Sequence, residues 1–107
     1  MIKVQTCSSS IIVCPMGDLD LAGSIHLLHQ VAEIVEPGLS VTIDLAHACF
    51  IDAAGLSALA ASVRRVRAAG GTACITNASP RHRWLLRLTG SDRLIAPSSA
   101  MPRLGAA

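Results

Sequence analysis

Residues 50–56 hold the side chains with the clearest potential for chemistry, because an apolar segment there runs into an aspartate and then into an alanine-rich stretch. Asp52 stands at the expected N-cap of a helix, where its carboxylate accepts the free backbone N–H groups of the first turn. The positive end of the helix dipole lies at the same point. The order Asp52, Ala53, Ala54, Gly55 therefore predicts a surface corner that favours anions, with Asp52 either a cap alone or a cap that also contacts a partner.

The common catalytic signatures are absent from the sequence. It contains no Gly-x-Ser-x-Gly elbow, no phosphate-binding Gly-x-x-x-x-Gly-Lys loop and no His-Glu-x-x-His zinc motif. His26, His29 and Glu33 share one helix face by their spacing, but such a face is more often solvated than metal-binding. We therefore expect no catalytic residues, no metal and no cofactor. An enzyme or ligand carrier built around an apolar pocket remains an alternative, ranked third after the two protein-binding functions described at the end of this section.

Length and composition narrow the class of protein further. A chain of 107 residues fits one domain with one core. With 51% hydrophobic and 15% charged residues it is typical of a folded protein, and no segment approaches the run of about 20 apolar residues that spans a bilayer. A net charge of +2 with 2% aromatic residues argues against a nucleic-acid partner. The N-terminus has no secretory pattern, so we expect a cytoplasmic protein without direct membrane insertion.

Four cysteines lack the spacing of a zinc site or a Cys-x-x-Cys motif, namely Cys7, Cys14, Cys49 and Cys74. In a cytoplasmic protein we expect them to be small buried hydrophobic residues. The alternative is redox sensing by Cys7 and Cys14, which would face each other if the first two strands form a hairpin.

The apolar pattern predicts strands that alternate with helices. Residues 2–6 and 11–13 are expected to form a hairpin, and Asp18 and Asp20 precede a helix that buries about half of its surface. The predicted buried face carries Ile25, Leu28, Ala32 and Val35, with Leu27, Val31 and Ile34 beside them. Residues 41–49 are predicted to form one buried central strand, followed by a helix that ends near residue 69. A strand at 72–76 and a helix at 80–88 are expected after it. This order predicts an α/β domain with a mixed sheet of four or five strands and three helices.

The helix after Asp52 has two unlike faces. Its larger apolar side chains are expected against the sheet, and these are Leu56, Leu59, Val63 and Val66. Small residues occupy the expected outer face, and these are Ala54, Ser57, Ala58 and Ala61. Either alanine simply favours an exposed helix, or a flat surface lets another protein approach closely. The helical period does not choose between these two interpretations.

Several motifs, in order, resemble the STAS family of anti-sigma factor antagonists. Residues 17–20 are similar to the family's Gly-x-Leu-Asp, and residues 52–56 to its Asp-Ser-Ser-Gly-Leu. Gly70 and Gly71 match its turn after the central helix, and residues 88–90 its closing Leu-Thr-Gly. The resemblance covers residues 11–95, and the family's C-terminal helix is expected to be shortened here. We expect a STAS-like domain over residues 1–96 and a loosely ordered tail over 97–107.

The resemblance implies a regulatory binding module. Its partner would be an anti-sigma factor or serine kinase of the histidine-kinase-like ATPase type, and docking would free a sigma factor. Ala54 occupies the family's phosphoacceptor position and cannot be phosphorylated, which leaves Ser57, one turn further, as a substitute acceptor or a plain surface residue. The alternative is a small STAS subunit that docks on the ATPase of a lipid or solute transporter. In either case the expected contact residues are Asp18, Asp20, Asp52, Ala53, Ala54, Ser57, Ala58 and Ala61.

Overall fold

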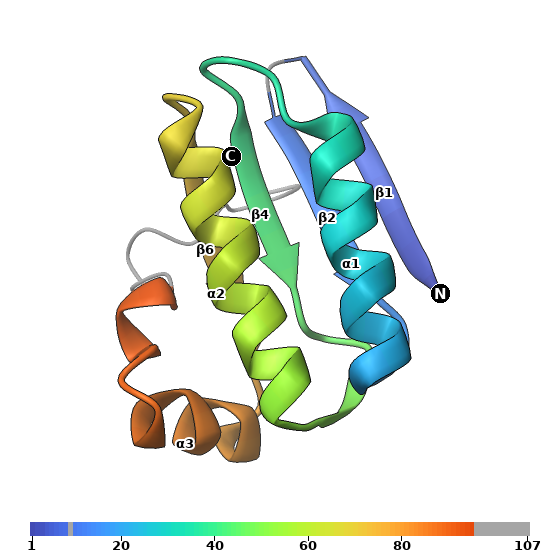
Figure 1. Cartoon of the computed structure of the whole chain (residues 1–107), viewed down its shortest axis with the longest axis vertical. Coiled ribbons are helices and arrows are strands. Elements are labelled where there is room, and N and C mark those ends of the chain that lie inside the picture. The colour runs from blue at the N-terminus through green and yellow to red at the C-terminus, as the bar shows by residue number, and fades with distance from the viewer. Residues whose placement is uncertain (9, 96–107) are drawn as a thin grey trace.

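A four-stranded sheet covered on one face by two parallel helices forms the body of the protein (Figure 1). The computed structural model describes residues 1–8 and 10–95. The strands are β1 (Ile2–Cys7), β2 (Ser10–Pro15), β3 (Gly17–Leu19), β4 (Ser40–Asp44), β5 (Ala48–Ile51) and β6 (Thr72–Thr76). The helices are α1 (Leu21–Ile34), α2 (Ala53–Ala68), α3 (Pro80–Leu88) and the short 3-10 helix η1 (Asp92–Leu94). The mixed α/β fold with three α-helices and an N-terminal hairpin is confirmed. Residues 97–107, the expected tail, lie outside the described residues.

The order of strands in the main sheet is β1-β2-β4-β6. β1 and β2 pair antiparallel as a hairpin, whereas β4 lies parallel to both β2 and β6. Parallel neighbours need long crossovers, and α1 and α2 provide them. Both crossovers pass over the same face of the sheet, so α1 and α2 lie side by side (Figure 1).

A second, two-stranded sheet joins β3 to β5, and it corrects the prediction of one continuous strand over residues 41–49. β4 ends at Asp44, whose Oδ1 accepts the backbone N–H of Ala46 at 2.9 Å. This local bond turns the chain out of the main sheet. β3 and β5 then carry the chain directly into the first turns of α1 and α2.

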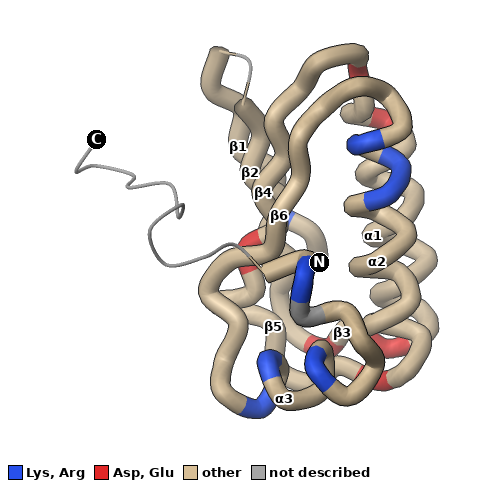
Figure 2. Tube along the Cα trace, turned by 90° about the vertical axis from the view of Figure 1, so that its left-hand side faces the viewer, with Lys and Arg blue, Asp and Glu red and all other residues tan. Residues whose placement is uncertain are grey.

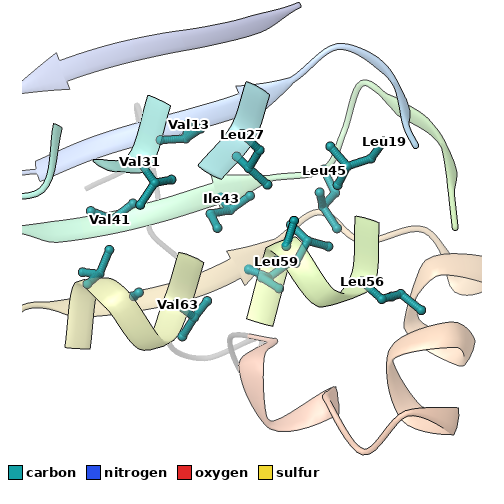
Figure 3. Close-up of a cluster of buried hydrophobic side chains, with 14 of the residues drawn as sticks. Val13, Leu19, Leu27, Val31, Val41, Ile43, Leu45, Leu56, Leu59 and Val63 are labelled. Carbon is teal, nitrogen blue, oxygen red and sulfur yellow. The ribbon is translucent and has the colours of Figure 1, made fainter. Parts of the chain in front are cut away.

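The core lies between the sheet and the two helices (Figure 3). Alternate residues of β2 and β4 point at the helices, and the apolar faces of α1 and α2 meet them. Fully buried members include Val13, Leu27, Val31, Ile43, Leu59 and Val63. The prediction that Leu56, Leu59, Val63 and Val66 are buried is confirmed.

The buried face of α1 is only partly the predicted one. Leu27 and Val31 are completely buried as expected, whereas Ile25 is 58% and Leu28 39% exposed. Ser24 takes a place on the inner face, where its hydroxyl donates to the carbonyl oxygen of Asp20 at 2.6 Å. A satisfied serine is acceptable in a core, but a count of apolar residues does not detect it.

The cysteine predictions are also corrected. Cys7 and Cys49 are exposed, and Cys14 and Cys74 are half-buried, so none of the four is a buried core residue. The β1–β2 register places Cys14 opposite Lys3 and Cys7 opposite Ser10, so Cys7 and Cys14 do not face each other.

Candidate functional site

Two aspartates cap the two crossover helices in the same way. Asp20 Oδ1 accepts the backbone N–H of Gly23 at 3.0 Å, and Asp52 Oδ1 accepts that of Gly55 at 2.9 Å. In each case the carboxylate accepts the backbone N–H of the residue three positions later, which is the geometry expected of an N-cap. The predicted capping role of Asp52 is confirmed, and Asp20 repeats it on α1.

The small sheet brings these two caps to one corner of the molecule. Leu19 pairs with Ile51, so the aspartates that follow them begin neighbouring helices. The backbone N–H of Asp52 donates to the carbonyl oxygen of Leu19 at 3.5 Å. Figure 2 shows acidic segments in red where α1 and α2 begin. Asp18, Asp20 and Asp52 therefore lie on adjoining segments, as the sequence predicts, and we call this region the acidic corner.

Gly55 allows the two segments to approach this closely. A Cβ at Gly55 would overlap the carbonyl oxygen of Leu19 and would lie 3.0 Å from Cγ2 of Ile51. The position tolerates no side chain, because backbone of β3 fills the space that a Cβ would need. The close packing of α2 against β3, which carries Asp18 and leads into Asp20, thus requires glycine at this position.

The small residues of α2 do not all lie on the surface. Ala53 and Ser57 are exposed, and Ala54 and Ala61 are partly exposed. Ala58, expected on the outer face, is 2% exposed, and that prediction is wrong. α2 packs against α1 as well as against the sheet, so its buried arc is wider than one apolar stripe.

An apolar hollow of about 210 Å³ lies beside the first turns of α2. α2 forms one wall, and the segment that follows α3 forms the other. The hollow is lined by Ala53, Leu56, Ser57, Ala60, Thr89 and Ser91. Sequence reasoning missed the second wall, although the closing Leu-Thr-Gly at residues 88–90 was a visible signal.

A separate hollow of about 160 Å³ lies at the side chains of β1, β2 and β4 that point away from the helices. Cys14 lines it together with Lys3 and Asp44. Burial and the Asp44 carboxylate raise the pKa of the Cys14 thiol, and the Lys3 ammonium opposes them only in part. Because only the thiolate is a good nucleophile, Cys14 is poorly suited to nucleophilic chemistry at neutral pH.

The family to which the whole sequence can be assigned is consistent with the fold described above. The sequence model of the STAS domain matches residues 1–104. The chain belongs to the STAS domain family. No curated protein sequence matches this STAS domain.

Solved structures share the STAS fold. The anti-sigma factor antagonist SpoIIAA in its unphosphorylated form superimposes with a TM-score of 0.76 at 16% identity, over 100% of this chain and 98% of that one. An anti-sigma factor antagonist from Mycobacterium paratuberculosis gives a TM-score of 0.76 at 23% identity, over 89% and 81% of the two chains. A sulfate transporter family protein from Wolinella succinogenes gives 0.72 at 17% identity, over 86% and 75%.

Within residues 1–8 and 10–95, no helix has both the length and the apolar character needed to cross a membrane. Among the side chains that the structure describes, no three residues of the types His, Cys, Asp and Glu lie together in a way that would hold a metal ion.

Proposed function

We propose that this STAS domain is a non-catalytic regulatory module that docks on an anti-sigma factor of the kinase type and thereby frees a sigma factor. The docking surface comprises the acidic corner and the accessible small residues of α2, namely Ala53, Ala54, Ser57 and Ala61. The observation that carries the proposal is the position of Ala54. It lies in the first turn of α2, partly exposed, two residues after the cap Asp52.

Ala54 makes the contact insensitive to phosphorylation at this position. A phosphate on a side chain there would add a charge of about −1.5 to −2 and bulky oxygen atoms to a surface packed by the partner. It would also stand among the carboxylates of Asp18, Asp20 and Asp52, which repel it. A methyl group accepts no phosphate and mimics none, so the domain remains in the binding-competent form.

Affinity capture followed by a charge-and-size variant tests the docking surface. The tagged protein is incubated with host lysate, and the captured proteins are identified by mass spectrometry. Ala54→Arg is expected to abolish capture of the kinase-type partner, because it places a long cation in a close-packed contact. Ala32→Arg, an exposed alanine changed in the same way on α1, is the matched control and should capture normally. Equal capture by both variants would move the interface away from the corner.

The absence of a switch is tested with the purified partner and ATP. The wild-type complex should persist after incubation with ATP, whereas Ala54→Ser should gain phosphate and release the partner. Ser57 is exposed one turn further along α2 and is the competing acceptor. Phosphorylation of Ser57 in the wild type, accompanied by release, would contradict the proposal.

The second candidate is a STAS subunit that docks on a transporter ATPase. It is favoured by the shared fold of the sulfate transporter family protein. The same capture experiment distinguishes the two candidates, because a transporter ATPase would be recovered from the solubilised membrane fraction and a kinase-type anti-sigma factor from the soluble fraction.

A further inference from the structure

A basic hollow continues the apolar hollow along α2. Its volume is about 340 Å³, and it shares Ala60 and Ser91 with the apolar hollow. Its other lining residues come from the C-terminal half of α2 and from the segment around η1, namely Arg64, Arg67, Gly90, Arg93 and Leu94. We call the two hollows together the α2–η1 groove. It is apolar beside the acidic corner and positively charged at the far end.

The three arginines at the far end come from two distant segments of the chain. Arg64 and Arg67 lie one turn apart on α2, and Arg93 faces the same hollow from η1. Figure 2 shows the positive segments of α2 at the end opposite the acidic corner. Arg67 is held in place, because its Nη2 donates to the carbonyl oxygen of Ala73 at 3.1 Å.

These cations have no carboxylate partner among the side chains that the structure describes. The close contact between a basic and an acidic side chain found there joins Nδ1 of His29 and Oε1 of Glu33 on α1, at 3.8 Å. Arg64, Arg67 and Arg93 are all exposed. A cluster of like charges is mutually repulsive, so an anionic group placed in the hollow relieves that repulsion.

We infer that the α2–η1 groove binds an acidic segment of a partner protein, with an apolar side chain in the first hollow and carboxylates at Arg64 and Arg93. Guanidinium groups pair with carboxylates in a bidentate geometry, which gives this end its preference. The apolar end has the small lining that an inserted leucine or valine side chain can fill. Free phosphate or a nucleic acid fits less well, since phosphate leaves the apolar end empty and the groove has no aromatic side chain for stacking.

The groove extends the docking surface proposed above. The inference rests on the proposed function in one respect, namely that the acidic segment belongs to the kinase-type anti-sigma factor. The groove itself is tested without that partner. The probe is an acetylated, amidated synthetic peptide in which leucines are followed by a run of glutamates, titrated into the isotope-labelled full chain and followed by NMR. Amide shifts are expected at Ala60, Arg64 and Ser91, and binding should weaken as salt is added.

Charge reversal identifies the residues responsible. The double change Arg64→Glu with Arg93→Glu is expected to weaken peptide binding by about tenfold, because like charges then face each other. Arg65→Glu is the matched control, since Arg65 is exposed on the same helix but does not line the groove, and its effect should stay below about twofold. A circular dichroism spectrum of each variant confirms that it folds.

Three results of the binding measurements with synthetic probes would overturn the inference. One is the absence of shifts in the groove at millimolar peptide, and another is equal weakening by Arg65→Glu and the double change. The third is tighter binding of tripolyphosphate or a short single-stranded DNA than of the peptide, which would make the groove a general anion site. If the peptide binds but no kinase-type partner is captured, the proposed function fails and the groove stands. If the partner is captured equally by the double variant, the groove inference fails alone.

Discussion

Replacing Gly55 by alanine tests how the acidic corner is assembled. The added Cβ would lie 3.2 Å from the carbonyl carbon of Leu19 and 3.0 Å from Cγ2 of Ile51, and it would overlap the Leu19 carbonyl oxygen. Two of these three atoms are backbone, so the clash is not relieved by a side-chain rotation. α2 must move away from β3, or β3 must separate from β5.

The expected free-energy change has two opposing parts. Overpacking of a rigid site costs about 1–3 kcal/mol, and the backbone neighbours place Gly55→Ala at about 3 kcal/mol. Alanine in place of glycine in a helix returns up to about 1 kcal/mol. The net loss of unfolding free energy is therefore about 2 kcal/mol, which lowers Tm by about 8–16 °C in a domain of this size.

Urea unfolding followed by circular dichroism measures this loss. Ser57→Ala is the matched control, because it places alanine on an exposed position of the same helix and should change stability by less than about 0.5 kcal/mol. If Gly55→Ala were as stable as the wild type, close contact between α2 and β3 would not be what requires glycine here.

Three further predictions concern the cap, the core and a thiol. Asp52→Ala should lose about 1 kcal/mol in urea unfolding because the N–H of Gly55 loses its acceptor, while Asp52→Asn should lose less; equal losses would exclude capping as the cause. Leu59→Ala should lose about 2–5 kcal/mol in the same assay, since Leu59 is fully buried, and a loss below that range would contradict the core packing. The raised pKa of Cys14 predicts that its labelling by iodoacetamide, followed by mass spectrometry, has a midpoint at higher pH in the folded protein than in urea. The protonated thiol contributes to stability below its unfolded pKa, and this contribution is lost as pH rises through the folded pKa. Coincident midpoints would refute the shift.

The linear order of residues determined the local structure of the site. Asp52 before an alanine-rich stretch specified a cap, because capping depends on a carboxylate and the backbone N–H three residues later. The start of α3 is equally local, because the Ser79 hydroxyl accepts the backbone N–H of His82 at 3.1 Å and Pro80 fits the first helical position. The lack of a hydroxyl at Ala54 is likewise a property of the sequence alone.

Helical period gives relative directions along one helix, but it does not say which neighbours surround that helix. By helical period Ala58 falls on the same side as Ala54 and Ala61, away from Leu56, yet it is buried, and α2 packs on α1 as well as on the sheet. Ile25 is exposed and the neighbouring Ser24 is buried, although an apolar pattern predicts the reverse. The packing of α1 on the rest of the domain, which the helical period does not contain, decides both.

The groove depends on tertiary structure in the same way. Arg64 and Arg93 are 29 positions apart in the sequence, and only the packing of the segment after α3 beside α2 brings them to one hollow. The requirement for glycine at position 55 also comes from a distant segment, the carbonyl group of Leu19. The sequence by itself determined the three helices, the cap at Asp52 and the lack of a hydroxyl at position 54. Tertiary packing decided which surface of α2 remains accessible and what charge lies beside it, because both depend on contacts between residues remote in the chain.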